Sequence, residues 1–321
     1  MLPQVVVEPR REEAAGHLKP RSAWKLFRQV IATEIASRRF EKAFLLACHS
    51  VLAPVATWRW FDYLESVRVR AGVETVPYRL ARKAGQTFLH HSLPPRARIH
   101  LLTTHYEQLL ATLGATTVAK ILRGEVVVLA QIEGRSAVPY RLYLARNGLM
   151  SREGELIIHL ERLQDDRRVA TMSVVVGALA AGEPTDLWIG GLQGCRGADS
   201  KAVTVKVTRD LWGLRPKDLM IHVAYALADV FGAARVKAIS NAGHAFEPMK
   251  GKRVGWRADY DSFWRELGGE PIAGGFFLLP EARHRRSAEE VQPSKRSAWR
   301  GRYALLDEIG ADIRLLGLAR R

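Results

Sequence analysis

The stretch that decides the fold is residues 187–240, LWIGGLQGCRGADSKAVTVKVTRDLWGLRPKDLMIHVAYALADVFGAARVKAIS. It opens with an apolar strand pattern at Leu187–Leu192 and passes into a glycine-containing loop at Gln193–Ser200. A strong helix pattern covers Lys217–Phe231, and Val236–Ser240 is typical of a returning strand. A strand, a helix and a strand at this spacing predict a crossover connection, which joins two parallel strands of one sheet.

Upstream of this unit, the sequence predicts an antiparallel meander. Short segments rich in β-branched and aromatic residues are separated by turn pairs such as Asn147-Gly148 and Asp165-Asp166. Within one segment His159 and Glu161 alternate with apolar residues, which indicates a strand but does not settle which of its faces is buried. The predicted strands are Val126–Ile132, Tyr140–Ala145, Glu155–Arg162, Ala170–Ala178 and Leu187–Leu192.

The first third of the chain is expected to be helical. Residues 22–53 carry apolar side chains at helix spacing, and Pro54 interrupts them. A further helix is expected over Ile99–Leu113, with Gly114 as its C-cap. The fold class is therefore α+β, with a helical N-terminal region packed on a mixed, mainly antiparallel sheet. We expect a flexible tail over 1–21, a helical region over 22–122 and an α/β domain with basic C-terminal helices over 123–321.

The composition favours an anionic partner and a reducing compartment. The 321 residues include 49 Lys and Arg against 33 Asp and Glu, a formal charge of +16, which attracts nucleic acid, anionic lipid or a phosphate-bearing donor. A solvated basic surface is the alternative interpretation. Cys48 and Cys195 are too far apart for a disulfide framework or a structural zinc site, and no metal is expected.

No segment of the sequence predicts secretion or a membrane span. The N-terminus lacks a signal-peptide core, and no apolar run approaches the roughly 18 residues of a transmembrane helix. We therefore expect a cytoplasmic protein, at most peripheral to the inner membrane.

The loop at Gly190–Gly197, GGLQGCRG, is a candidate phosphate site. Glycines let backbone amides approach a phosphate closely, and Arg196 and Lys201 would add positive charge. A tight strand-to-helix turn is the alternative interpretation. The residues expected to bind a phosphate-bearing donor are Gly191, Gln193, Gly194, Arg196, Gly197 and Lys201.

A second candidate site follows the returning strand. Asn241 and His244 lie just past its carboxyl end, where crevices form in α/β sheets. Asn241 could hold a substrate amide, and His244, with an ordinary pKa of about 6.5, could act as a general base. A turn that hydrogen-bonds its own backbone would also explain these residues. Tyr260 stands between Asp259 and Asp261, and two carboxylates near a tyrosine add a further acid–base candidate, although this block also fits a helix N-cap.

The C-terminal region interleaves basic and aromatic residues. Such a pattern suits phosphate contact with base stacking, a basic helix on anionic lipid, or a solvated face. The residues concerned are Arg283, Arg285, Arg286, Lys295, Arg296, Trp299, Arg300, Arg302 and Tyr303.

Several blocks in a fixed order resemble the bacterial VirK/YbjX family, from about residue 22 onward. The resemblance implies an association with virulence and with envelope stress or antimicrobial-peptide resistance, and it supplies no set of catalytic residues. The blocks are Ile189–Gly194, Gly213–Asp218, Ile239–His244, Ala258–Gly269, Gly275–Pro280, Pro293–Arg296 and Arg302–Asp307.

The glycine loop also lies where Gcn5-related acyltransferases carry their pyrophosphate loop. Their pattern is Gln or Arg, two residues, Gly, one residue, then Gly or Ala. Here Gln193 is followed by Gly194, Cys195, Arg196, Gly197 and Ala198, so the spacing departs from that pattern. The likeness implies an acyl- or aminoacyl-transferase that uses an acyl-CoA or another phosphate-bearing donor and acts on an amine of a peptide or envelope component. The alternative is a non-catalytic basic protein that binds anionic lipid or nucleic acid.

Overall fold

The computed structural model describes residues 17–18, 23–148, 150–246, 259–281, 285 and 287–318. The helices of these parts are α1 (Ala23–Ala36), α2 (Phe40–Leu52), α3 (Pro54–Ala71), α4 (Tyr78–Ala81), α5 (Pro95–Leu122), α6 (Ser200–Asp210), α7 (Pro216–Phe231), α8 (Tyr260–Glu266) and α9 (Arg296–Leu318). The strands are β1 (His17–Leu18), β2 (Val76–Pro77), β3 (Val127–Glu133), β4 (Pro139–Arg146), β5 (Leu156–Arg162), β6 (Arg167–Gly177), β7 (Asp186–Gly194), β8 (Val236–Ile239), β9 (Glu270–Ile272) and β10 (Phe276–Leu278).

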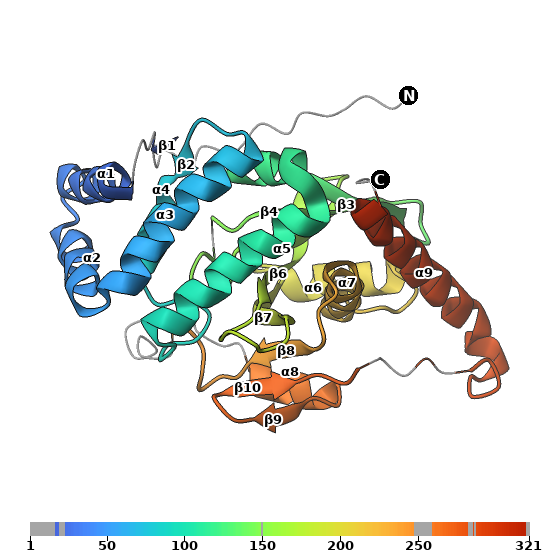
Figure 1. Cartoon of the computed structure of the whole chain (residues 1–321). Helices are drawn as coiled ribbons and strands as arrows, with labels where there is room; N and C mark the ends of the chain where they lie inside the picture. Colours follow the sequence, from blue (N-terminus) through green and yellow to red (C-terminus); the bar gives the residue numbers. More distant parts are fainter. Residues whose placement is uncertain are drawn as a thin grey trace.

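The main sheet has the mixed topology that the sequence predicts. Its strands lie in the order β3-β4-β5-β6-β7-β8-β10-β9 (Figure 1). The meander from β3 to β7 is antiparallel, and β7 and β8 are the parallel pair joined by the α6–α7 crossover. The α+β class and the mainly antiparallel sheet are therefore confirmed.

The helical region differs from the expected single helix over 22–53. It forms α1 and α2, because Arg38 adopts a left-handed φ of 53° and breaks the helix between them. Pro54 begins α3 at a position where its missing N–H would have had no helical partner. Gly114 is non-helical, with φ 76° and ψ 166°, yet α5 resumes after it, so this glycine kinks the helix where we expected a C-cap.

One hydrophobic core joins the helical region to the sheet. Trp60 of α3 and Leu109 of α5 belong to the same buried cluster as Met172 of β6, Ile189 of β7 and Ile309 of α9. In Figure 1, α1 and α2 lie at one end of the molecule and α9 at the other, with α3 and α5 side by side between them. Helix α7 packs against β6, β7 and α9. The division into three regions stays a prediction.

The N-terminal tail predicted over 1–21 lies mostly outside the described residues. His17–Leu18 are described, and they pair with Val76–Pro77. Within the described ranges, no helix is both long enough and apolar enough to cross a bilayer.

A β-bulge bends strand β7 at Gly190. Ser173 of β6 lies opposite Gly191, but the next residue, Val174, lies opposite Ile189, so Gly190 is the extra residue. A bulge bends its strand and increases the local twist. Glycine is required there, because a Cβ atom would overlap the backbone oxygen of Glu153. The parallel pairing of β7 with β8 ends at Ile189, directly before the bulge.

Candidate functional site

The glycine loop and the segment after β8 lie close together at the point where β7 stops pairing with β8. Beyond Ile189, β7 continues to Gly194 without pairing to β8. Tyr260, the first residue of α8, lies at this divergence, and its hydroxyl accepts a hydrogen bond of 3.4 Å from the backbone N–H of Leu192. The glycine loop at the end of β7 and the segment after β8 are therefore neighbours in space.

Tyr260 is a buried phenol that keeps its proton at neutral pH. Its ring stacks against His244 at a centroid distance of 5.5 Å and against Trp264 at 6.0 Å. Burial raises the pKa of Tyr260 well above its usual value, and the nearby Glu153 carboxylate raises it further. A group in this state can donate a proton to a developing anion.

Asn241 orients the start of α8. Its side-chain oxygen accepts the backbone N–H of Tyr260 at 2.9 Å, and its amide nitrogen donates to Asp259 at 2.9 Å. Its own backbone N–H donates to Asp261 at 2.7 Å. Asp259 is the N-cap of α8, and hydrogen bonds from Ser262 and then from Asn241 lower the pKa of Asp259 to about 2. These contacts hold the Asn241 side chain against the start of α8, and its predicted role of holding a substrate amide stays a prediction.

His244 is fully buried beside a carboxylate. Its Nδ1 accepts the backbone N–H of Phe246 at 3.2 Å, and its Nε2 lies 3.6 Å from Oε1 of Glu153. Glu153 also borders Gly191, where a Cβ atom would overlap the carboxylate. Sequence reasoning missed Glu153, because an acid in the connection between two strands carries no motif and becomes a candidate only through its buried partners.

Two buried polar networks hold the segment that carries Glu153. The Asn147 side chain donates to the backbone oxygen of Met150 at 2.8 Å and to the hydroxyl of Ser173 at 2.7 Å. Lys83 and Glu155 form an ion pair in which both side chains are buried, and the Tyr106 hydroxyl donates to Glu155 at 2.7 Å. The connection between β4 and β5 is thereby fixed to the core on both sides of Glu153.

The glycine loop is closed by an arginine that the sequence did not single out. Arg167 donates to Asp199 at 2.6 Å, to the backbone oxygen of Arg196 at 3.2 Å and to the Cys195 sulfur at 3.3 Å. The Arg196 guanidinium donates to the side-chain oxygen of Gln193. Arg196 is also close enough to Tyr260 for its charge to lower the pKa of that phenol slightly, against the larger effect of burial.

Open space remains at Gly194. A Cβ atom there would meet only Cε of Lys217, at 3.7 Å, an ordinary contact. Lys217, in the first turn of α7, lies over the Phe263 ring at 5.5 Å, and burial lowers the pKa of its amine. A cation therefore stands beside the part of the loop that has space for an added side-chain atom.

The predicted donor-binding residues separate into three places. One place is next to Tyr260, where β7 separates from β8, and it holds Gln193, Gly194 and Arg196. Gly197 follows them and turns the chain into α6 with φ 111°. Gly191 lies beneath Glu153 and Met150 and has a packing role. Lys201 lines a different cavity, on α6. The parts of the chain that the structure describes contain no group of three or more His, Cys, Asp or Glu side chains able to hold a metal ion.

A row of polar side chains crosses the sheet and ends at the loop. Tyr143, His159, Thr171 and Gln193 are cross-strand partners on β4, β5, β6 and β7. The rings of Tyr143 and His159 are 5.1 Å apart, and His159 Nδ1 lies 2.9 Å from the Thr171 hydroxyl. Burial lowers the pKa of His159 to about 3, so its imidazole is neutral. Sequence alternation placed His159 in a strand, but only the register shows that its face leads to Gln193.

Comparison with known proteins gives a family and its relatives. Residues 36–314 match the family described as "Protein of unknown function (DUF535)". The chain is 27% identical over 274 residues to the "Uncharacterized protein YbjX" of Escherichia coli (strain K12), a match that covers 85% of this chain and 82% of that protein. It is 24% identical over 255 residues to an "Uncharacterized protein" of Haemophilus influenzae, covering 79% and 83%. No solved structure matches the chain.

Proposed function

The chain belongs to the DUF535 family, which confirms its resemblance to VirK/YbjX proteins, and from this premise we propose that it is an acyl- or aminoacyl-transferase-like enzyme. It would take its acyl group from a phosphate-bearing donor such as an acyl-CoA and transfer it to an amine of a peptide or envelope component. The observation that carries the proposal is the divergence of β7 from β8 just past Gly190, between the glycine loop and Tyr260.

The arrangement of the sheet supports the transferase proposal by analogy. An antiparallel meander leads to one parallel crossover. By the likeness drawn from the sequence, the loop between β7 and α6 would correspond to the pyrophosphate loop of Gcn5-related acyltransferases. The altered spacing from Gln193 to Gly197 departs from the pattern of those enzymes. Because one fold can serve many reactions, the chemistry has to be argued from the side chains at the divergence.

The backbone of β7 supports binding of an extended donor. From Gly190 to Gly194 the strand is not paired with β8, and the Leu192 N–H already donates to Tyr260. An extended ligand with amide groups, such as the pantetheine arm of CoA, would pair with the other backbone groups of this edge as another strand does. Its phosphates would then reach Gly194, where space remains, with Arg196 and Lys217 as the nearby cations.

The buried groups at the divergence match the proton transfers of acyl transfer. The acceptor nitrogen would bond to the acyl carbon, and the carbon–sulfur bond of the donor would break. The proton lost by the amine would pass to the Glu153–His244 pair, in which Oε1 and Nε2 are 3.6 Å apart. The departing sulfur would take the proton of Tyr260, which is protonated at neutral pH. Asn241 would contribute by fixing the backbone of Tyr260.

Calorimetric titration with CoA and acyl-CoA tests the donor. Gly194→Trp should abolish the binding heat, because the new side chain fills the space beside Lys217 while the backbone φ of Gly194 is not in the left-handed region. Ala111→Trp, at an exposed position of α5, is the matched control and should bind as the natural protein does. Absence of heat from the natural protein, or equal heat from Gly194→Trp, would remove the donor from the proposal.

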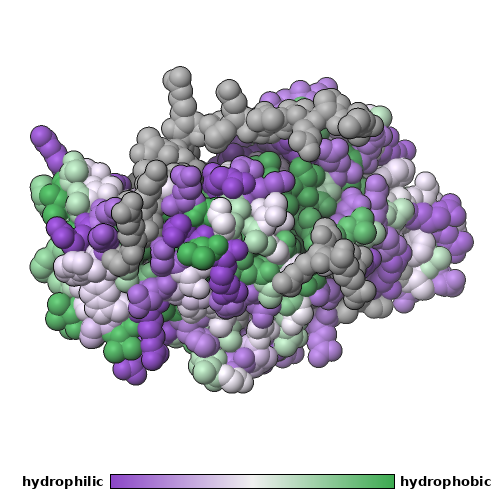
Figure 2. Space-filling model, turned by 45° about the horizontal axis from the view of Figure 1, so that its top comes forward, coloured by the Kyte–Doolittle hydropathy of each residue, from purple (hydrophilic) through white to green (hydrophobic). Residues whose placement is uncertain are grey.

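A second candidate function rests on an exposed apolar surface at the α1–α2 end. Phe44, Val51 and Leu52 of α2 are 67%, 77% and 82% exposed, and Phe40 of α2 and Trp24 of α1 are also exposed. Figure 2 shows apolar colouring at this end of the molecule. Apolar side chains bordered by cations favour an anionic lipid surface. The bordering exposed cations are Lys25, Arg28, Arg38 and Lys42.

The C-terminal basic residues support nucleic-acid binding less well. Arg285 pairs with Asp307 at 2.8 Å and lies over the Tyr303 ring, and Arg302 donates to the backbone oxygen of Trp212 at 3.3 Å. These cations are already engaged within the protein. Arg283 and Arg286 lie outside the described residues. The predicted cytoplasmic location, at most peripheral to the inner membrane, stays a prediction.

Co-sedimentation with vesicles tests whether the exposed apolar surface at the α1–α2 end binds anionic lipid. Recovery with anionic vesicles should fall in the Phe44→Asp/Leu52→Asp double variant, because two charges would have to enter the lipid surface. Leu315→Asp, on the exposed face of α9, is the control and should leave recovery unchanged. Equal recovery with neutral and anionic vesicles would contradict the lipid proposal, and salt-sensitive recovery with RNA alone would point to nucleic acid.

A further inference from the structure

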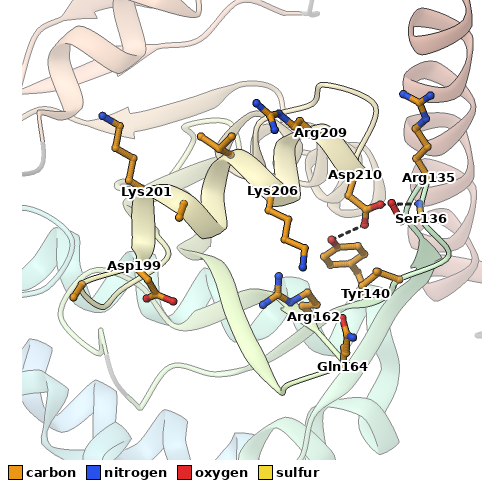
Figure 3. A pocket seen from close by; sticks show the side chains of 14 residues that line it. Arg135, Ser136, Tyr140, Arg162, Gln164, Asp199, Lys201, Lys206, Arg209 and Asp210 are labelled. Atoms are coloured by element: carbon orange, nitrogen blue, oxygen red, sulfur yellow. Dashed lines mark hydrogen bonds between the residues drawn. The ribbon is translucent and has the colours of Figure 1, made fainter.

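A hollow lies beside α6, and Tyr260 is not among the residues that line it. Its volume is ≈ 820 Å³, within the range of small-molecule sites, and it opens between α6 and the turns that join β3 to β4 and β5 to β6 (Figure 3). Its lining residues are Arg135, Ser136, Val138, Tyr140, Arg162, Gln164, Ala198, Asp199, Lys201, Ala202, Val205, Lys206, Arg209 and Asp210.

The charges around this α6 cavity are unbalanced. Five of its lining residues are cations and two are acids. Both acids are engaged within the protein: Asp199 accepts from Arg167 at 2.6 Å, and Asp210 accepts from the Tyr140 hydroxyl at 2.7 Å. No side-chain hydrogen bond or ion pair links Lys206 or Arg209 to any of the described residues. An anion is therefore the partner that this lining lacks.

Two of the cations converge inside the cavity. Figure 3 shows the Lys206 side chain extending from α6 toward the Arg162 guanidinium and the Tyr140 ring. Arg162 is largely buried and pairs with Asp165 at 2.6 Å, so its remaining donors are held in one direction. Two like charges directed at one space repel each other, and an anion between them would turn that repulsion into attraction.

Apolar side chains form another part of the lining. Val138, Val205 and Ala202 share the cavity with the Tyr140 ring, and Val205 is 43% exposed. A simple inorganic ion would leave these groups facing water. A ligand with an apolar or planar body beside its charge would cover them and contact the cations at the same time.

The walls of the cavity are already fixed in place. Asp210 joins the end of α6 to the turn after β3 by accepting the backbone N–H of Ser136 at 2.8 Å, in addition to the Tyr140 hydroxyl. The backbone N–H of Arg135 donates to the backbone oxygen of Asp210 at 2.8 Å. A site whose walls are preformed loses little conformational entropy when a ligand binds.

We propose that the α6 cavity binds a phosphate monoester carried on an apolar or planar body. The phosphate lies between Lys206 and Arg162, Lys201 and Arg209 stand at the rim, and the body covers Val138 and Val205. Phosphate is favoured over carboxylate because several oxygens of one group can meet several donors at once. The site is separate from the β7–β8 divergence and does not depend on Tyr260 or on the transferase proposal.

Calorimetric titration of the full chain tests the site with three probes. Adenosine 5′-monophosphate and a short-chain phosphatidic acid below its micelle concentration carry a phosphate on a planar body and on an apolar body. Adenosine lacks the phosphate. At least one phosphate probe should bind, and adenosine should bind at least about tenfold more weakly, since a hydrogen bond to a charged group is worth that factor or more. The better phosphate probe identifies the source of the ligand.

Two variants and a control locate the binding. Lys206→Glu should weaken the better probe at least about tenfold by reversing a charge in the cavity. Ala202→Phe should weaken it similarly by filling the hollow at an exposed helix position. Lys120→Glu makes the same charge change at an exposed position of α5 away from the cavity and should bind as the natural protein does.

Three results would overturn the proposal. The first is the absence of binding by both phosphate probes at millimolar concentration. The second is an equal loss in Lys206→Glu and Lys120→Glu, which would mean attraction by net charge alone. The third is unchanged binding in Ala202→Phe when thermal unfolding shows that the variant is folded. Loss of CoA binding in Gly194→Trp has no bearing on these outcomes, because that residue does not line the cavity.

Discussion

Removing the Lys83 amine should destabilise the protein far more than removing an exposed cation. Lys83 and Glu155 form an ion pair with 3% and 2% of their side-chain surfaces exposed. Lys83→Met would leave the Glu155 carboxylate buried, where the Tyr106 hydroxyl still donates a hydrogen bond to it. Breaking one side of a buried pair costs about 3–5 kcal/mol, because the other charge stays uncompensated.

The free energy of unfolding from urea titration measures this cost, and thermal unfolding gives a second readout. The melting temperature should fall by roughly 6–10 °C, at about 2 °C per kcal/mol for a chain of this size. Arg123→Met is the control. It breaks the pair with Glu125, whose side chains are 50% and 47% exposed, and should cost less than about 1 kcal/mol.

A double variant separates the lost charge pair from lost packing. Lys83→Met/Glu155→Gln removes both charges and keeps an acceptor for the Tyr106 hydroxyl, so most of the stability should return. The reasoning would be refuted if Lys83→Met cost no more than Arg123→Met. It would also be refuted if the double variant were as unstable as the single one, since packing of the lysine chain would then explain the loss.

Three further predictions concern the site. Burial holds the pKa of His159 at about 3, so its contribution to stability is present above pH 6.5 and is lost as pH falls. Between pH 7.5 and 5.5 His159 should account for about 1 kcal/mol of the loss in unfolding free energy, in addition to the loss from His105, whose pKa burial also lowers to about 3. His159→Gln should remove the His159 share in urea unfolding, and an unchanged pH dependence in that variant would contradict the prediction. Gly190→Ala should lower the urea midpoint strongly because its Cβ overlaps the backbone oxygen of Glu153, whereas Gly194→Ala should leave it nearly unchanged; equal midpoints would contradict the packing argument. Asn241→Ala should speed amide exchange at the start of α8, and unaltered protection there would show that the asparagine does not orient that helix.

Local patterns in the sequence were enough to predict the main elements. The five meander strands and the crossover from β7 through α7 to β8 lie where alternation and helix spacing placed them. These patterns are decided by neighbours within one or two turns of chain, so they can be read without the fold. The break at Arg38 was missed because a left-handed φ at a non-glycine residue leaves no such pattern.

The candidate site depended on contacts between distant segments. Glu153 became part of it because the bulge at Gly190 and the burial of His244 bring three separate segments together. Gly191 and Lys201 were grouped with the loop by sequence, yet one packs beneath Glu153 and the other faces the α6 cavity. Side-chain direction at the end of a strand follows from register and bulges, which a linear pattern does not contain.

The sequence by itself determined the family, because its blocks can be matched in order along residues 36–314 without the fold. It also determined the order of the strands along the chain and the glycine loop before α6, because these depend on residues close together in the chain. Only the tertiary structure decided that Tyr260 lies against the backbone of Leu192, and that a cation-lined cavity lies on α6. The Tyr260 contact depends on how β7 separates from β8 after its bulge, and the cavity depends on how α6 packs on the sheet. Steric fit between segments that are far apart in the chain settles both arrangements.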